Sequence, residues 1–202
     1  FEAIGQSDGV SKKTGLTTII DFRKKDIVMG GSGAPLVPIL DFHLFPEIRR
    51  PFICQNLGGI ANSTLVEKTF LKCIGYDSGP ANCLIDRAFQ IKHKSKIFFD
   101  MNGATAKKGK VVPALLNKIL RNPFFSLIPP KSTGNREFGI EYTKNLFRYS
   151  LQKGIRFNDL VSTLSTATIE SIAKSYERFI FPISNPTHVL VSGGGGRNSF
   201  IM

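Results

Sequence analysis

The sequence predicts an α/β protein, and three observations indicate this class. Short apolar runs of strand-like composition alternate with longer segments of helical periodicity. Tight glycine turns separate several of these runs. A hydrophobic content of 42% over 202 residues is enough to build a buried core. No apolar run approaches the roughly 18 residues that a membrane span needs, so we expect no membrane partner.

Residues 1–50 predict one strand and one glycine-rich loop. Residues 16–21 have strand-like composition, and a basic cluster follows at 23–25. The loop occupies residues 30–35, where glycines permit a positive φ and a close approach of the backbone to a ligand. Taken alone, an ordinary glycine-rich turn is the stronger interpretation of this loop.

From Pro51 the pattern predicts three consecutive strands, at 52–57, 61–66 and 70–76. Gly58-Gly59-Ile60 joins the first two strands as a tight hairpin. A helix is then expected from Pro80 to about Gln90, which completes a βββα unit.

Asp77 follows the third predicted strand, within the segment Gly75-Tyr76-Asp77-Ser78-Gly79-Pro80-Ala81-Asn82. Gly79 and Pro80 suit the start of a helix, because proline has a fixed φ and no N–H to satisfy. Asp77 is therefore predicted at the carboxyl end of a strand, facing the amino end of a helix, where an ionised carboxylate is favoured. A carboxylate in this place can bind a metal, accept a proton or cap the turn.

The second half of the chain is predicted to be mainly helical. Helices are expected at 112–120, from about 137 to 153, and up to 181 from a cap at Asn158 or Asp159. Residues 189–191 predict a buried strand that runs into four glycines at 193–196. A strand, a glycine turn and a helix start form the usual geometry for a ribose or phosphate, although the same order is a common α/β connection.

The net charge of +12 is spread along the chain, so we do not expect a nucleic-acid partner. Cys54 and Cys73 lie in apolar runs and are expected to be buried, reduced thiols of a cytoplasmic protein. The three histidines are far apart in the sequence and predict no metal cluster.

Several segments occur together in an order typical of one enzyme family. They are Asp21-Phe22-Arg23 with Asp26, residues 30–38, residues 56–62, residues 75–82 with Asp86, Gly103-Ala104 with Gly109, residues 130–134, Thr163-Leu164, and Gly193-Gly194-Gly195 with Asn198. Through these segments the chain resembles the anhydro-N-acetylmuramic acid kinase family, which belongs to the sugar kinase, Hsp70 and actin superfamily. Ser32 and Ala81 depart from the glutamine and glycine usual in the family, and Asn135-Arg136 departs from its usual Arg-Glu.

The resemblance implies an actin-like ATPase (ribonuclease H-like) fold with two lobes. Residues 1–50 would be the remainder of the first, sugar-side lobe, which is incomplete. Residues 51–202 would be the second lobe, with the βββα core and the nucleotide loops, truncated at its end. The family's amino-terminal phosphate loop and carboxyl-terminal helical stretch have no counterpart here, so the chain is expected to be an internal fragment without kinase activity of its own.

The resemblance also implies a reaction and a set of site residues. Family members use ATP, Mg²⁺ and water to open the 1,6-anhydro ring of anhydro-N-acetylmuramic acid and phosphorylate O6 in cell-wall recycling. Asp77 would be the catalytic general base on the water. The substrate-binding candidates are Arg23, Gly31, Ser32, Gly33 and Ala34. The nucleotide-binding candidates are Asn56, Gly58, Gly59, Asn62, Gly193, Gly194, Gly195 and Asn198.

Other interpretations of the sequence stay open. Arg23 can hold the sugar's lactyl carboxylate or a hydroxyl, or form a structural ion pair with Asp21 or Asp26. The whole chain can instead be an inactive, truncated remnant of the enzyme, or another sugar or acyl kinase of the superfamily. The partners expected from the resemblance are the anhydro amino sugar and ATP, with a homodimer open for full-length members.

Overall fold

The computed structural model describes residues 7–31, 33–94 and 97–202. The chain divides into two compact units, Phe1–Ala34 and Pro35–Met202. The boundary expected from the resemblance lay at residue 50, and that two-lobe division stays a prediction.

The described part of the first unit is helical, with α1 (Ser7–Thr14) and α2 (Phe22–Val28). The strand expected at 16–21 is wrong, because these residues pair with no strand. Leu16, Ile19 and Ile20 are exposed to solvent. Strand-like composition alone does not make a strand, since its backbone groups need a neighbouring strand as hydrogen-bond partner.

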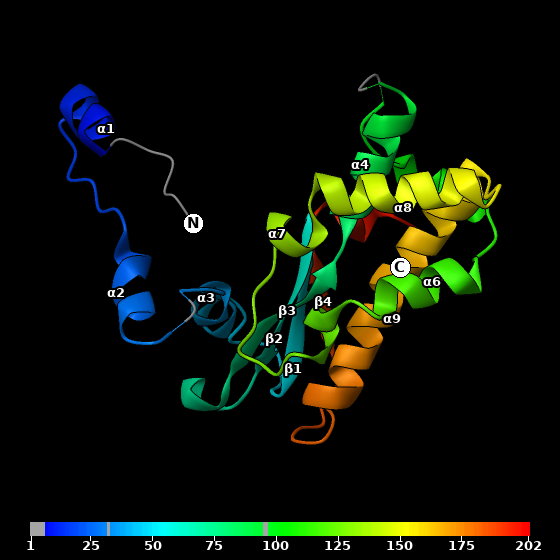
Figure 1. Ribbon diagram of the computed structural model, residues 1–202. Coiled ribbons are helices and arrows are strands. Elements are labelled where there is room, and N and C mark those ends of the chain that lie inside the picture. Colours follow the sequence, from blue (N-terminus) through cyan, green and yellow to red (C-terminus); the bar gives the residue numbers. More distant parts are fainter. Residues whose placement is uncertain (1–6, 32, 95–96) are drawn as a thin grey trace. The chain divides into compact units, whose positions relative to one another are not determined.

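The second unit is built on a mixed four-stranded sheet in the order β3-β2-β1-β4 (Figure 1). The α/β class expected from the sequence is thus confirmed. Its strands are β1 (Phe52–Leu57), β2 (Ile60–Val66), β3 (Ile74–Pro80) and β4 (Val189–Ser192). Strands β1, β2 and β3 form an antiparallel meander, and β4 pairs in parallel with β1. The first two strands and their glycine hairpin agree with the sequence prediction to within one residue.

The third strand and the helix after it start later than the sequence predicted. Phe70–Lys72 is a 3₁₀ turn, and β3 continues through Asp77 to Pro80. Helix α4 (Asn82–Lys92) begins only after this strand. Pro80 is tolerated in a strand because β3 lies at the edge of the sheet in the order above, where a missing N–H costs no ladder hydrogen bond.

Helices of the second unit cover the sheet and pack on one another. They are α3 (Val37–Leu44), α4, α5 (Ala104–Lys107), α6 (Pro113–Leu120), α7 (Asn135–Phe138), α8 (Ile140–Gln152) and α9 (Phe157–Phe179), with 3₁₀ turns η1 (Phe70–Lys72), η2 (Met101–Gly103), η3 (Pro123–Ser126) and η4 (Gly194–Arg197). The largest hydrophobic cluster joins α4, α6, α8 and α9 through residues such as Leu84, Leu115, Leu146 and Leu164. Burial of apolar surface, at about 25 cal/mol per Å², makes this cluster the main stabilising element. None of the described helices is both long enough and apolar enough to span a bilayer.

Two helix predictions need correction. The helix expected from about 137 to 153 is divided at Gly139, whose extended backbone leaves no room for a side chain beside Asn135. The long helix α9 has Arg156 at its N-cap, while the carboxylate of Asp159 pairs with Arg156 at 2.8 Å and accepts from Lys110 N. Asp159 therefore ties the helix to the loop before α6 instead of capping it.

Strand β4 is exposed, where the sequence predicted a buried strand. Val189 is 47% exposed and Val191 is 38% exposed, and β4 lies at the end of the strand order opposite to β3. The chain then makes only the 3₁₀ turn η4 where a helix start was expected. An apolar run is buried only when another element packs over it. The sequence of the run does not show whether such an element is present.

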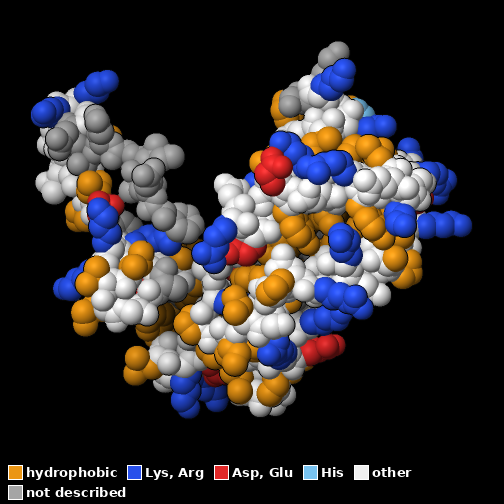
Figure 2. All heavy atoms as spheres, viewed as in Figure 1, with side chains coloured by type: hydrophobic (Ala, Val, Ile, Leu, Met, Phe, Trp, Pro, Cys, Tyr) orange, Lys and Arg blue, Asp and Glu red, His pale blue; other side chains and the backbone are white. Residues whose placement is uncertain are grey.

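Of the two cysteines expected to be buried, only Cys54 is, and the prediction for Cys73 is wrong. All three cysteines are free, with Cys54 buried but Cys73 and Cys83 only partly buried. Among the described residues, no group of three His, Cys, Asp or Glu side chains could hold a metal ion. On the face in view in Figure 2, the Lys and Arg side chains are scattered among polar and apolar ones.

Candidate active site

Three of the predicted site residues stand in one row across the sheet. Asn56 of β1 pairs with Asn62 of β2, and Asn62 pairs with Asp77 of β3. Because neighbouring strands lie about 4.8 Å apart, Asp77 and Asn56 are roughly 10 Å apart across two strand spacings. Three residues separated by up to 21 positions in sequence thus form one line.

This row points away from helix α9. The adjacent row, Gln55, Ser63 and Tyr76, faces that helix, since Tyr76 Oη donates to Ser175 O at 3.3 Å. Side chains alternate between the two faces of a strand, so the row of Asn56, Asn62 and Asp77 lies on the opposite face.

A β-bulge occurs beside the candidate base. Asp77 and Gly79 of β3 pair with consecutive residues of β2, Asn62 and Ala61, which leaves Ser78 as the extra residue. The Ser78 hydroxyl donates to Ala61 O at 3.2 Å. Bulges bend a strand and redirect side chains, and they are common next to active sites.

Asp77 is buried, with 7% of its surface exposed, and is held by the loop after η3. Its Oδ2 accepts hydrogen bonds from Ser132 Oγ at 2.9 Å and from Thr133 N at 2.7 Å. The backbone N of Asp77 also donates to Lys131 O at 3.0 Å. Three consecutive loop residues therefore fix both the backbone and the carboxylate of Asp77.

Burial raises the pKa of Asp77, and the hydrogen bonds from Thr133 and Ser132 and the charge of Lys131 oppose that rise without cancelling it. The expectation of a low-pKa carboxylate at a helix amino end is therefore wrong. The first free N–H groups of α4 belong to Ala81, Asn82 and Cys83, and they donate to the carbonyls of Gly58 and Gly59 instead. A raised pKa makes the carboxylate a stronger base.

The glycine hairpin and the glycine turn meet at this end of the sheet. Gly193 has φ 83°, and a Cβ there would lie 2.6 Å from Asn56 Oδ1. A Cβ on Gly195 would lie 2.6 Å from Leu57 Cβ. Gly194 differs, because the nearest atom to its Cβ position is Asn82 Nδ2 at 4.0 Å. Gly193 and Gly195 allow close packing of the turn on β1, and Gly194 lies on its open side.

A cavity of about 390 Å³ opens beside Gly194. Asn82 lies on its wall, and Asn82 Nδ2 donates to Leu57 O at 3.0 Å. Asp86, one helical turn further on the same face of α4, is also on the wall. Burial raises the pKa of Asp86 to about 6, opposed by Arg87. Polar residues on this wall include Asn82, Asp86, Asn102, Arg197 and Asn198.

Asn198 has a structural role in addition to its place on the cavity wall. Its Oδ1 accepts from Phe200 N at 3.0 Å and from Ile201 N at 3.4 Å, which ties the last described turn to the cavity. The side chain is buried and lies against Gly103. Replacing Asn198 would therefore disturb the turn as well as the wall.

The predicted sugar-side residues belong to the first unit and form their own small loop. Gly33 N donates to Asp26 Oδ2 at 2.6 Å, and Arg23 Nε donates to Gly33 O. Gly31 packs so closely on the Asp26 carboxylate that a side chain there would require the carboxylate to move. Arg23 and Asp26 thus shape the loop from both ends. Ser32 lies outside the described residues, and the substrate-binding role of these residues stays a prediction.

The structure brings together Asn56, Asn62 and Asp77 in one row, and Gly193, Gly194, Gly195 and Asn198 around one end of β1. Asn82, Asp86, Asn102 and Arg197 were missed as site residues. The spacing of Asn82 and Asp86, four positions apart on a predicted helix that starts beside the glycine hairpin, was the available signal for two of them. Asn102 and Arg197 carried no such signal, since only tertiary packing brings them together.

An α/β domain that gathers glycine loops and asparagines at the ends of its strands, beside a polar cavity and a clamped carboxylate, is typical of nucleotide-dependent enzymes. The family model described as "Anhydro-N-acetylmuramic acid kinase" matches residues 3–202. The chain belongs to this family, as the resemblance predicted.

Curated relatives carry the same description. The chain is 37% identical over 201 residues to the anhydro-N-acetylmuramic acid kinase of Caldanaerobacter subterraneus subsp. tengcongensis, a match that covers 98% of the chain and 51% of that protein. It is 40% identical over 200 residues to that of Gloeobacter violaceus, again over 98% and 51%. The chain therefore spans about half the length of the curated relatives it matches. Among solved structures, it is similar to the activator of the 2-hydroxyisocaproyl-CoA dehydratase from Clostridium difficile with bound ADPNP, at 14% identity and a TM-score of 0.46 over 76% of this chain and 49% of that one.

Proposed function

We propose that this chain supplies the nucleotide loops and the general base of a kinase that hydrolyses the 1,6-anhydro ring of anhydro-N-acetylmuramic acid and phosphorylates O6. The observation that carries the proposal is the row of Asn56, Asn62 and Asp77 on one face of the sheet. It puts a buried carboxylate two strands away from the asparagine that contacts the glycine turn.

The nucleotide site in this proposal lies along the end of β1. The cavity beside Gly194 is lined by amide, carboxylate and guanidinium groups that can bond the hydroxyls of a ribose or the edge of an adenine. The Gly58–Gly59 hairpin lies against the start of α4, next to Asn82 of the same cavity. Glycine backbone can approach phosphate oxygens without a Cβ in the way, so the hairpin is the proposed phosphate contact.

The base in this proposal is Asp77. Its fixed orientation and its raised pKa suit a carboxylate that takes a proton from water near neutral pH. As the water oxygen bonds to C1 of the sugar, its proton passes to Asp77 and the bond from C1 to O6 breaks. ATP, when bound, supplies the γ-phosphoryl group that O6 accepts, and ADP is the leaving group.

The sugar side of the proposal rests on the first unit. Arg23 and Asp26 shape the loop that holds Gly31, Gly33 and Ala34, and their polar groups are candidates for the sugar's carboxylate and hydroxyls. Mg²⁺, the homodimer and a cytoplasmic location, where ATP is plentiful, follow from family membership and stay proposals.

The test is Asp77→Asn in the longest protein that contains this chain. The amide keeps the shape but cannot take the proton, so turnover of the anhydro sugar should fall by about 10³-fold or more. ATP affinity, measured by calorimetry, should stay within about twofold, since the proposed nucleotide contacts are untouched. Equal losses of turnover and ATP affinity would contradict the assignment of Asp77 as base.

Asp159→Asn is the matched control. It removes a carboxylate that is also hydrogen bonded, but at the start of α9 against Lys110 and Arg156. Turnover in this variant should equal that of the parent. If neither parent nor control turns over the anhydro sugar but both phosphorylate another sugar or an acyl acid, the alternative kinase assignment replaces the proposal.

A further inference from the structure

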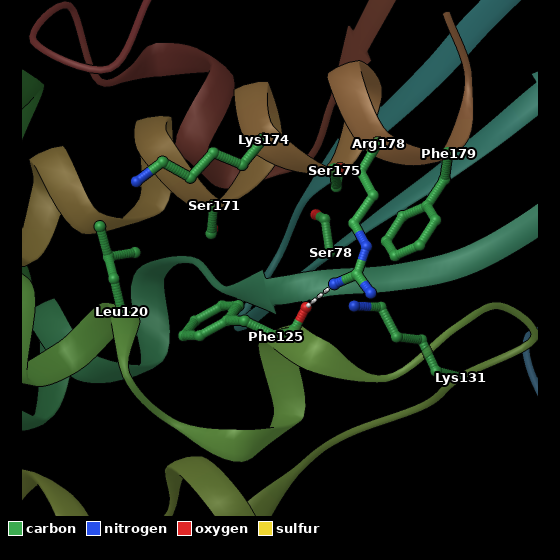
Figure 3. Close-up of a pocket in the computed structure, with 9 residues that line it drawn as sticks. All are labelled: Ser78, Leu120, Phe125, Lys131, Ser171, Lys174, Ser175, Arg178 and Phe179. Carbon is green, nitrogen blue, oxygen red and sulfur yellow. Dashed lines mark hydrogen bonds between the residues drawn. The ribbon is translucent and has the colours of Figure 1, made fainter. Parts of the chain in front are cut away.

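A second cavity, of about 220 Å³, lies on the α9 side of the sheet, away from the proposed nucleotide site (Figure 3). Its wall combines three cationic side chains, Lys131, Lys174 and Arg178, with the rings of Phe125 and Phe179. The volume is many times the roughly 15 Å³ that one water needs on the same measure.

Lys131 is the most unusual of these residues, because it is a lysine with only 5% of its surface exposed. Its ammonium lies between two aromatic rings, 4.6 Å from the centre of Phe124 and 5.0 Å from that of Phe179. This ammonium donates to Phe124 O at the long distance of 3.5 Å. An ammonium has three N–H donors, so this lysine is poorly satisfied by the described part of the protein.

A second cation points at the same place. In Figure 3 the guanidinium of Arg178 and the ammonium of Lys131 extend toward one another, with Arg178 Nη1 donating to Phe125 O at 3.3 Å. Neither forms an ion pair with a carboxylate of the described residues, whereas Lys174 pairs with Glu170 at 3.4 Å. Two neighbouring like charges repel each other, and an anion bound between them would reduce that repulsion.

The serine hydroxyls of α9 that line the cavity donate to the backbone of their own helix. Ser171 Oγ donates to Thr168 O at 2.9 Å, and Ser175 Oγ donates to Ile172 O at 2.8 Å. Their protons are committed to the helix, so the donors directed into the cavity come from the cations. Lysine and arginine together, as a point charge and a planar fork, are the usual partners of a phosphate group.

We infer that this cavity binds a phosphate group, as free phosphate or as a phosphate monoester, between Lys131 and Arg178. A dianion would neutralise both cations, and the two phenyl rings leave room for an organic substituent on one side. The loop that carries Lys131 also supplies the hydrogen bonds from Ser132 and Thr133 to Asp77. An anion bound here is therefore placed to influence the hydrogen bonds that hold the candidate base.

The protonation of Lys131 predicts how binding depends on pH. Burial, followed by the charge of Arg178, lowers the pKa of Lys131 to about 8, and Asp77 opposes this shift. The charged groups that act on this lysine are Arg178 from α9 and Asp77 from β3. Lys174 lines the same cavity, but in Figure 3 its side chain extends away from Lys131. Affinity for an anion should therefore fall as pH rises through about 8, while the bound anion should hold the proton on Lys131 to higher pH.

The experiment is calorimetric titration of the longest protein that contains this chain with inorganic phosphate and, in a second arm, with glucose 6-phosphate. Lys131→Met and Arg178→Gln should each weaken binding by about tenfold or more, since each removes one charged partner. Arg121→Gln is the matched control, because it removes one positive charge from an exposed arginine outside the cavity. This variant should bind phosphate as tightly as the parent. Tighter binding of the sugar phosphate would identify a monoester as the ligand, and equal binding would identify free phosphate.

Two further measurements keep the result decisive. Thermal melts of each variant separate lost binding from lost folding. Arg178 is exposed, so Arg178→Gln should change the stability of the fold little. Sulfate, whose charge is constant between about pH 7 and about pH 9, should repeat the loss of affinity with rising pH. Phosphate binding that survives in both folded variants, or that is abolished by Gly194→Val at the proposed nucleotide site, would overturn the inference.

Discussion

Two adjacent rows of polar side chains cross the same three strands, and they differ in where their partners come from. In the row that faces α9, Gln55 Oε1 accepts from Ser63 Oγ and from Tyr176 Oη, both at 2.7 Å. Gln55 Nε2 donates to the carbonyls of Asn56 and Asn62. This row is satisfied by its own members and by Ser175 and Tyr176 of the helix that covers it.

The other row depends on distant loops. Asp77 receives its hydrogen bonds from a loop 55 and 56 residues further along the chain, and Asn56 contacts the glycine turn after β4. A polar row completed by a packed helix stabilises a fold, while a row completed by loops has groups that can turn to a ligand. Within one sheet, the row that faces α9 therefore contributes to stability, and the row that contains Asp77 is the candidate for function.

The largest effect should come from breaking the row that faces α9 with Gln55→Leu. The leucine leaves the hydroxyls of Ser63 and Tyr176 buried without their shared acceptor, at about 1–3 kcal/mol each. Urea denaturation should therefore show the free energy of unfolding reduced by about 2–4 kcal/mol, with ATP affinity of the folded protein unchanged. The triple variant, which adds Ser63→Ala and Tyr176→Phe to Gln55→Leu, removes the two unpaired hydroxyls. It should recover part of the lost free energy of unfolding.

A smaller effect is expected at the glycine turn, where substitutions of Gly193 and Gly194 should have different consequences. Gly194→Val projects into open space beside the cavity, so ATP affinity should fall by about tenfold or more while the melting temperature holds. Gly193→Val meets Asn56 and Leu57 at a positive φ, so it should destabilise the fold itself. Calorimetry and melts on both variants test the pair. An unchanged ATP affinity in Gly194→Val would reject the nucleotide assignment.

The smallest effect should come from Ser132→Ala, which removes one donor to Asp77 and leaves Thr133 N in place. The serine hydrogen bond lowers the pKa of Asp77, so its loss should raise that pKa further. Because the base works only when ionised, the acidic limb of the pH profile of kcat should move to higher pH. Ser199→Ala, a change at a serine bonded to Asn102 O, should leave the profile unmoved. A shift of the acidic limb toward lower pH would contradict the proposed effect of the Ser132 hydrogen bond on Asp77.

Local patterns predicted much of the second unit. Strands β1 and β2 and their hairpin were predictable because alternation and a glycine turn act over a few residues. The third strand was misjudged at both ends, because Phe70–Lys72 is apolar yet forms a turn and Pro80 is tolerated at an edge. The environment of Asp77 was misjudged because the residues that bury it lie more than fifty positions away.

The sequence by itself determined the α/β class, the order of the glycine loops and, through the family's segments, the membership that the comparison confirms. Tertiary structure alone decided that Asn56, Asn62 and Asp77 form one row, that Asp77 has a raised pKa, and that β4 is exposed. The physical reason is range. Turn and strand preferences arise from neighbouring residues, whereas strand register, burial and the pKa of a carboxylate depend on chain segments that meet only in the folded protein.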